Sequence, residues 1–189
     1  MRFFIFVFSI LFSLCSFSSQ SSLLVESALE RTNSFVIYNP AYFALDYPNG
    51  DVPKQFGVCT DVVIRSYRAL GIDLQKLVHE DMSENFDQYP AKRIWGQNRT
   101  DKNIDHRRVP NLRVFFERFG ESLSVSQKSS DYLPGDLVAW SVSGRPHIGI
   151  VTDQLDSKSQ NPLIVHNIGR GPKLEDMLFD YKITGHYRY

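Results

Sequence analysis

The chain has 189 residues, with 21 Lys and Arg against 21 Asp and Glu, so its formal net charge is zero. Hydrophobic residues make up 42% of the sequence, and the 11 Gly and 9 Pro are too few for a collagen-like or disordered chain. Because a neutral chain offers no broad basic surface, we expect no nucleic-acid partner. The length suits one domain preceded by a processed leader.

The first residues have the pattern of a secretory signal peptide. Arg2 supplies a positive charge before the apolar run Phe3–Leu14, and the serine-rich segment Ser16–Ser19 follows. A bilayer-spanning helix needs about 20 apolar residues, so this run is short for one. We therefore expect residues 1–18 to be a leader that is removed on export, and residues 19–189 to be a single periplasmic or secreted domain with no stable membrane span. Retention of the leader as an anchor is the alternative.

Apolar spacing predicts helices in the first two thirds of the chain. The segments Ser21–Phe35 and Thr60–Leu70 each place apolar residues on one face at helical spacing. Asp73 is suited to cap a further helix. Pro110–Phe119 has proline in its first turn and glycine after its end, which is typical of a helix. A long polar stretch, residues 83–108, precedes this last helix.

The last third of the chain has the alternation and composition of β-strands. The predicted strands are Leu137–Val142, His147–Thr152, Leu163–Ile168 and Ile183–Tyr189. Strands that follow one another with short turns favour an antiparallel meander. We therefore predict an α+β domain in which N-terminal helices pack on a C-terminal antiparallel sheet.

Cys59 carries the clearest chemical signal. Removal of the leader would take away Cys15, the other cysteine of the chain, and leave Cys59 at the start of a predicted helix. Backbone N–H groups and the positive end of the helix dipole stabilise a thiolate there. We therefore expect the pKa of Cys59 to be lowered and its sulfur to act as a nucleophile. A cysteine packed inertly beneath a helix end is the alternative.

Two histidines on consecutive predicted strands are candidates for the base and its partner. His147 begins a strand directly after a turn, where its ring can face a cleft and accept a proton from a thiol. A third polar group is needed to fix the tautomer of such a ring, and His166 is the favoured candidate. Asn167 lies on the opposite face by strand alternation; it is the reserve for this role and otherwise a candidate substrate-binding residue. A surface histidine at a strand end is the alternative for His147.

A polar cluster before the last helix is a candidate substrate clamp. Its members are Asp105, His106, Arg107 and Arg108. Two guanidinium groups can bind a carboxylate or a phosphate in bidentate fashion. The alternative is a structural ion-pair network with Asp101 and Asp105. Asp61, in the first turn of its helix, is expected to complement the helix dipole and is also a candidate substrate contact.

The histidines are poorly spaced for a metal site. His147, His166 and His186 could form a three-imidazole zinc set, but none forms the His-x-x-x-His pair of a helical zinc site. Gly169–Gly171 is too short to cradle a phosphate. We therefore expect no metal and no other cofactor.

The order of these motifs resembles the NlpC-type branch of papain-like cysteine hydrolases. The resemblance rests on Cys59 at a helix start, Pro134–Val138, His147–Val151 and a histidine, His166, on the next strand. It implies a papain-like fold with Cys59 as nucleophile, His147 as base and His166 as the orienting residue. The chain departs from that pattern at Thr60–Asp61, where a small Ser-Gly pair commonly follows the cysteine.

A second resemblance covers nearly all of the chain after the leader. The strings Gly57–Val63, Asn103–Leu112 and Thr184–Arg188 are similar to a bacterial family called domain of unknown function 1287. These strings are long and specific, so they imply that the chain is a member of this family. Membership implies a shared fold more firmly than a particular reaction.

Together the residues and the resemblance predict a secreted or periplasmic cysteine hydrolase that cleaves an amide bond. The resemblance implies that the substrate is the peptide part of peptidoglycan or a similar peptide. Two alternatives stay open: a catalytically silent cell-wall-binding module, and a thiol-dependent acyltransferase on the same fold. The sequence does not predict an oligomeric state.

Overall fold

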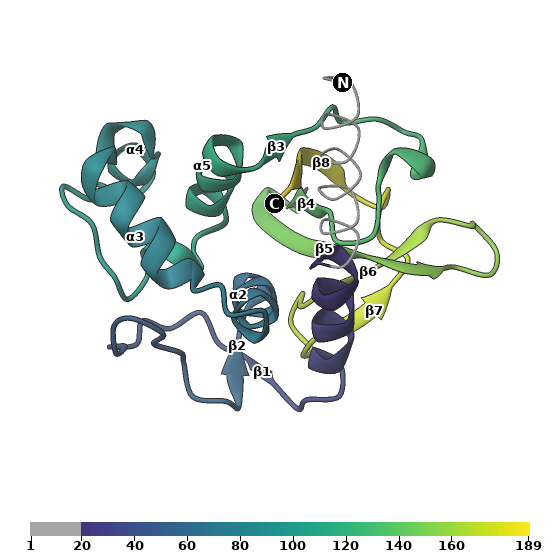
Figure 1. Ribbon diagram of the computed structural model, residues 1–189, viewed down its shortest axis with the longest axis horizontal. Helices are drawn as coiled ribbons and strands as arrows, with labels where there is room; N and C mark the ends of the chain where they lie inside the picture. Colours follow the sequence, from purple (N-terminus) through teal and green to yellow (C-terminus); the bar gives the residue numbers. More distant parts are fainter. Residues whose placement is uncertain (1–19) are drawn as a thin grey trace, which may run out of the picture.

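The computed structural model describes residues 20–189. The predicted leader, residues 1–18, and Cys15 lie outside the described residues. Within the described part, helices α3, α4 and α5 lie at one end of the molecule and the sheet lies at the other (Figure 1). Helix α2 lies between them, which places its first residue near the junction of the two halves.

Sequence signals at the helix starts explain where the helices begin. The first described helix covers residues 20–31, and α2 (Cys59–Ala69) follows an extended Val58. Helix α3 (Leu74–Glu84) begins where the Asp73 side chain accepts a hydrogen bond from the Gln75 N–H at 3.1 Å. The remaining helices are α4 (Ala91–Trp95), α5 (Val109–Phe119) and three 3₁₀ turns at Phe86–Gln88, Asp105–Arg107 and Ser129–Asp131.

The main sheet has six antiparallel strands in the order β3-β8-β4-β5-β6-β7. Its strands are β3 (Glu121–Ser122), β4 (Leu137–Val142), β5 (Arg145–Leu155), β6 (Pro162–His166), β7 (Lys173–Glu175) and β8 (Lys182–Arg188). Strands β4 to β7 form a meander, and β8 returns to pair with the other side of β4. Two short strands, β1 (Ile37–Tyr38) and β2 (Phe56–Gly57), pair in parallel beside the start of α2.

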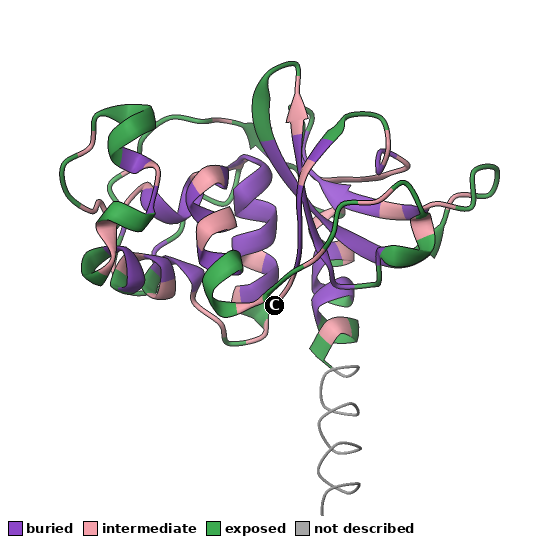
Figure 2. Ribbon diagram, turned by 90° about the horizontal axis from the view of Figure 1, so that it is seen from above, coloured by how far each residue is buried: buried purple, intermediate pink, exposed green. Residues whose placement is uncertain are grey.

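Each face of the main sheet covers an apolar cluster, and buried residues fill the junction between helices and sheet (Figure 2). The first cluster lies between the helices and the sheet and includes Val63 of α2 and Ile148 of β5. The second includes Trp140 of β4 and Leu178, whose carbonyl accepts a hydrogen bond from the Trp140 indole at 2.9 Å. The helices cover one face of the sheet, and the loop before β8 covers the other face.

The structure confirms the α+β class with helices before an antiparallel C-terminal sheet. The first helix ends at residue 31 rather than at the predicted Phe35, because Thr32 and Asn33 form tight turns back to the last helical carbonyls. Phe35 is consequently 84% exposed. Among residues 20–189, no helix is long and apolar enough to cross a membrane.

Candidate functional site

Cys59 is the first residue of α2 and is only 5% exposed. Its sulfur accepts hydrogen bonds from the backbone N–H groups of Ile148 and Thr60, which lower its pKa. Burial acts in the opposite direction and is the larger effect, so the pKa of Cys59 is raised to about 11. The predicted lowering of this pKa is therefore wrong, because desolvation of the thiolate outweighs the helix start.

His147 and His166 are joined in a hydrogen-bonded series that continues to Glu175. Nε2 of His147 lies 3.0 Å from Nδ1 of His166, and Nε2 of His166 lies 3.0 Å from a carboxylate oxygen of Glu175. The three side chains come from β5, β6 and β7, which are consecutive in the sheet. The structure thus brings the predicted base and its favoured partner together.

The carboxylate at the end of this series determines where the protons lie. A carboxylate only accepts, so His166 donates from Nε2 and accepts at Nδ1. His147 must then donate from Nε2, which leaves its Nδ1 as an unprotonated acceptor. Burial and the neighbouring His166 lower the pKa of His147 to about 3, so this ring is neutral across the physiological range. Burial also lowers the pKa of His166, against the opposing effect of Glu175.

Cys59 and His147 approach from opposite sides of one strand. The sulfur lies in the first cluster beside Ile148, whereas the His147 ring lies 6.0 Å from the Trp140 ring, which belongs to the second cluster. Among the described residues, the hydrogen bonds of the His147 side chain go to His166 and none joins it to the Cys59 sulfur. The sulfur contacts the backbone of Ile148, the residue after His147, and does not contact the His147 ring directly.

Asn167 points away from His166, as strand alternation predicts. Its side-chain N–H₂ donates to the Gly57 carbonyl at 3.4 Å, and the residue is fully buried. This contact ties the end of β6 to β2, the strand that leads into Cys59. A direct contact between Asn167 and a substrate stays a prediction.

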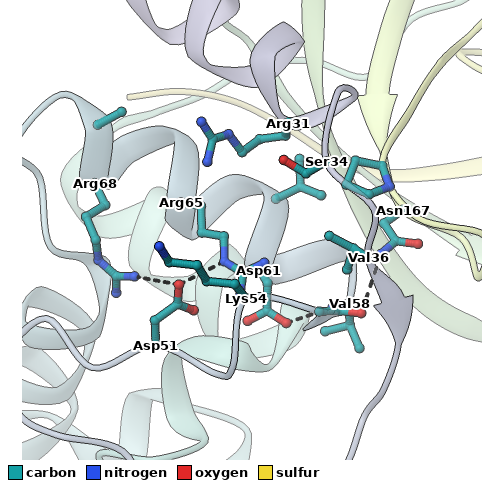
Figure 3. A pocket seen from close by; sticks show the side chains of 14 residues that line it. Arg31, Ser34, Val36, Asp51, Lys54, Val58, Asp61, Arg65, Arg68 and Asn167 are labelled. Atoms are coloured by element: carbon teal, nitrogen blue, oxygen red, sulfur yellow. Dashed lines mark hydrogen bonds and ion pairs between the residues drawn. The ribbon is translucent and has the colours of Figure 1, made fainter.

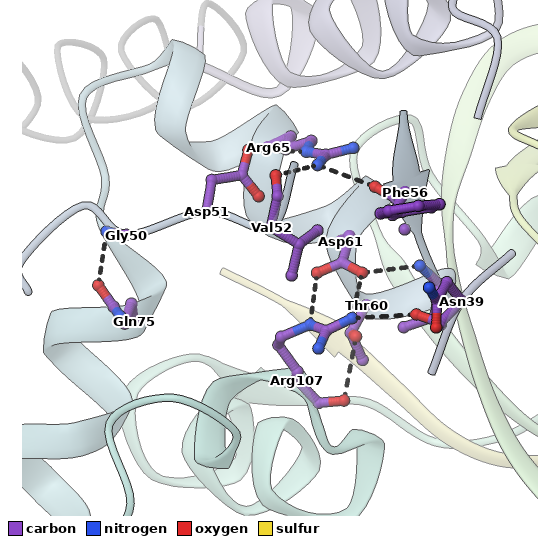
Figure 4. A network of polar contacts seen from close by, with 12 residues as sticks. Asn39, Gly50, Asp51, Val52, Phe56, Thr60, Asp61, Arg65, Gln75 and Arg107 are labelled. Atoms are coloured by element: carbon purple, nitrogen blue, oxygen red, sulfur yellow. Dashed lines mark hydrogen bonds and ion pairs between the residues drawn. The ribbon is translucent and has the colours of Figure 1, made fainter. Parts of the chain in front are cut away.

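Asp61 and Arg107 form a buried ion pair behind Cys59 (Figure 4). The guanidinium binds the carboxylate in bidentate fashion at 2.9 and 3.0 Å, and the same carboxylate accepts the Val58 N–H at 2.7 Å. Thr60 donates its hydroxyl to the Arg107 carbonyl at 3.1 Å. These bonds fix the turn that presents Cys59, while the predicted role of Asp61 and Arg107 in substrate binding stays untested.

The other members of the predicted clamp are also bonded within the protein. Asp105 is fully buried and accepts a hydrogen bond from the Gln97 side chain at 2.9 Å. His106 is buried, and this burial lowers its pKa to about 3. The Arg108 guanidinium stacks over Trp95 at 4.0 Å and also donates to Gln97. Any substrate contact of this cluster remains a prediction.

Two residues near the site were not found by sequence reasoning. Glu175 lies on the three-residue strand β7, which has too few residues for a pattern, but its place opposite Ile164 puts it on the His166 face. Tyr38 lies on β1 opposite Gly57, and its pKa is raised chiefly by burial. Only the pairing of short strands brings these two side chains to the site.

The described side chains do not form a metal centre. Within residues 20–189, no three side chains of His, Cys, Asp or Glu converge on a point where they could hold a metal ion. His186, the third histidine considered for zinc, instead lies 2.8 Å from a carboxylate oxygen of Asp136.

Residues 25–189 match the model of a family described as "Domain of unknown function (DUF1287)". The chain belongs to this family. It is also 49% identical over 167 residues to "Uncharacterized protein YijF" of Escherichia coli (strain K12), an alignment that covers 88% of this chain and 80% of that protein. No solved structure matches the chain. The family match confirms the resemblance of Gly57–Val63, Asn103–Leu112 and Thr184–Arg188 to this family.

Proposed function

We propose that the chain is a cysteine hydrolase in which Cys59 is the nucleophile and His147 the base. The observation that supports this most directly is the series His147–His166–Glu175, which leaves one acceptor nitrogen on His147. His147, the first member of the series, is the neighbour of Ile148 in the chain, and the Ile148 backbone N–H contacts the Cys59 sulfur. An orienting group behind a histidine base is the arrangement used by nucleophilic hydrolases on unrelated folds.

In the proposed reaction the Cys59 sulfur attacks an amide carbonyl while Nδ1 of His147 takes the thiol proton. The resulting oxyanion would be stabilised by the Cys59 N–H, which has no acceptor within its helix because it lies in the first turn. Collapse breaks the C–N bond, and His147 returns the proton to the leaving amine. Water, deprotonated by the same nitrogen, then hydrolyses the thioester and restores the thiol.

The resting pair is uncharged in this proposal. A thiol pKa of about 11 and an imidazole pKa of about 3 leave both groups neutral at pH 7. His147 therefore acts as a general base during attack, rather than holding a thiolate beforehand. The reaction also requires that the contacts covering Cys59 open to admit a substrate, and that the His147 ring, which bonds to His166 on the other side of β5, come within hydrogen-bond reach of the sulfur.

The substrate, location and finer fold class belong to the same proposal. The NlpC-type resemblance supports a papain-like fold and a peptide substrate such as the peptide part of peptidoglycan. The signal-peptide pattern supports a periplasmic or secreted location. A peptide of that kind would meet the chain on the side of β1 and β2, where Tyr38 lies partly exposed beside Cys59.

The test is cleavage of purified peptidoglycan fragments, with products resolved by mass spectrometry. We expect Cys59→Ala and His147→Gln each to lower the rate by a factor on the order of 10³. His79→Gln serves as the matched control, because His79 lies on α3 away from the series. Equal cleavage by the parent and Cys59→Ala would refute the proposal. Release of a free acid distinguishes hydrolysis from acyl transfer to an added amine.

A non-catalytic binding module is the second candidate. The burial of Cys59 and its raised pKa favour it, because both oppose a reactive thiolate. This candidate predicts that Cys59→Ala binds wall fragments as tightly as the parent chain does while neither protein cleaves them. Cleavage by the parent alone would exclude it.

A further inference from the structure

A cavity of about 420 Å³ lies along one side of α2 (Figure 3). Its walls come from α2, from the end of the 20–31 helix, from residues 51–58 and from the loop after β6. This volume is within the range of small-molecule sites, which are typically about 300–1,000 Å³. The cavity is separate from the His147 series, whose residues do not line it.

Positive charge in this cavity exceeds negative charge. Four cations line it, namely Arg31, Lys54, Arg65 and Arg68, against the two acids Asp51 and Asp61. Figure 3 shows the nitrogen atoms of the four cations gathered at one end of the cavity. Because Asp61 is already paired with Arg107, Asp51 is the lining acid left to balance the four cations; outside the lining, Asp73 lies 3.8 Å from Arg68 and Glu30 lies 3.3 Å from Arg31.

The contacts of the cations show which of them are available to a ligand. Arg65 and Arg68 share the Asp51 carboxylate at 2.9 and 3.4 Å, so that acid is used by two guanidiniums. Arg31 pairs with exposed Glu30 at 3.3 Å, an arrangement that contributes little in water. Among the described residues, Lys54 has no hydrogen-bond or ion-pair partner. Arg31 also donates from Nε to the Ser27 carbonyl at 3.3 Å, so its other terminal nitrogen and the Lys54 ammonium are the donors left for an incoming anion.

The opposite wall of the cavity is apolar. Val36, Val58 and Val62 line it together with Pro172, and Figure 3 shows Val36 and Val58 at the end away from the cations. A site with a cationic end and an aliphatic end recognises molecules with the same two parts.

From this juxtaposition we infer that the cavity binds a small organic anion, with its oxyanion head on Arg31 and Lys54 and its aliphatic body against Val36, Val58 and Val62. The head is a carboxylate or a phosphate, since both accept hydrogen bonds from guanidinium and ammonium groups. A bound anion would lie against Val58, the residue before Cys59. The inference does not depend on catalysis by Cys59, because it concerns binding alone.

The test is titration of the ¹⁵N-labelled chain with hexanoate, hexyl phosphate and neutral hexanamide, followed by NMR. Hexanoate or hexyl phosphate should shift the amide resonances of Gly57, Val58 and Ala69, which line the cavity. Comparison of the two anions identifies the head group. Hexanamide should bind at least about tenfold more weakly than the better anion, and added salt should weaken the anions only.

Matched variants locate the head group. Lys54→Met and Arg31→Met should each weaken the better anion about tenfold. Lys158→Met removes a lysine that is also exposed, from the β5–β6 turn, and should leave the dissociation constant unchanged. The inference is overturned if hexanamide binds as well as both anions, if the shifts map elsewhere, or if Lys54→Met and Arg31→Met both keep the parental affinity.

Discussion

The buried ion pair between Asp61 and Arg107 predicts a large stability loss for Arg107→Met. The two side chains are 4% and 2% exposed, and the replacement removes both bonds of the bidentate pair as well as a donor to the Ala41 carbonyl. The Asp61 carboxylate would then stay buried with the Val58 N–H as its remaining described donor. Removing one partner of a buried pair typically costs about 3–5 kcal/mol, and because one donor remains we expect about 3–4 kcal/mol.

The assay is urea unfolding followed by circular dichroism, with the free energy of unfolding extrapolated to water. The double variant Asp61→Asn/Arg107→Met should lose less than the sum of the two single variants, because no unpaired charge is left buried. Lys76→Met is the control, since its pair with Glu80 is exposed and 3.9 Å long. Its effect should stay within about 0.5 kcal/mol.

A loss below about 1 kcal/mol for Arg107→Met would refute this reasoning, since that is the range of an exposed pair. Strict additivity in the double variant would also refute it. Either result would mean that the turn before Cys59 is held by contacts other than the Asp61 carboxylate.

Three further predictions follow from the site. Glu175→Met should lower kcat for cleavage by about tenfold to a hundredfold with KM little changed, because His166 then lacks the acceptor that fixes its tautomer and, through it, the unprotonated Nδ1 of His147; an unchanged kcat would exclude this role. His147 and His106 have folded pKa values of about 3, below the unfolded value of about 6.5, so stability is full above pH 6.5 and falls below it by up to about 1.4 kcal/mol per pH unit for each histidine. Urea midpoints that do not change between pH 7 and 5 would contradict this. Gly149→Ala should destabilise the sheet by about 1–3 kcal/mol in the same assay, because the added methyl would lie 2.7 Å from a side-chain carbon on β6. A variant as stable as the parent would show that β6 shifts to make room for the methyl at no cost in stability.

The longer elements were predictable because their apolar residues repeat. Leu74 and Val78 of α3 are four residues apart, so they share one helical face, and both are fully buried. Strand β4 has the bounds expected from the run Leu137–Val142. The short helix α4 lies in the polar stretch before α5 and was not predicted, because Ala91 is its one buried residue and one residue makes no apolar repeat. Strands of two or three residues, such as β1 and β7, exist because they pair with a neighbour, and that pairing leaves no periodic pattern in the sequence.

The candidate site was predictable in its residue types and less so in its energetics. Strand alternation correctly separated His166 from Asn167. The pKa of Cys59 was predicted in the wrong direction because a helix start is a local feature, whereas burial depends on what packs over the sulfur. That cover includes Ile148, almost ninety residues further along the chain. Glu175 was missed for the same reason, because its contact with His166 depends on strand register.

The most direct test of a His147-assisted thiol is alkylation of Cys59 by iodoacetamide in the folded chain, measured by peptide mass spectrometry between pH 5 and 10. We predict that Cys59 is modified, that the rate keeps rising up to pH 10 because the thiol pKa is about 11, and that His147→Gln slows the reaction at pH 7 by about tenfold. Circular dichroism confirms that both proteins are folded. A parent thiol that stays unmodified over this range, or equal rates in the parent and His147→Gln, would contradict nucleophilic catalysis by Cys59.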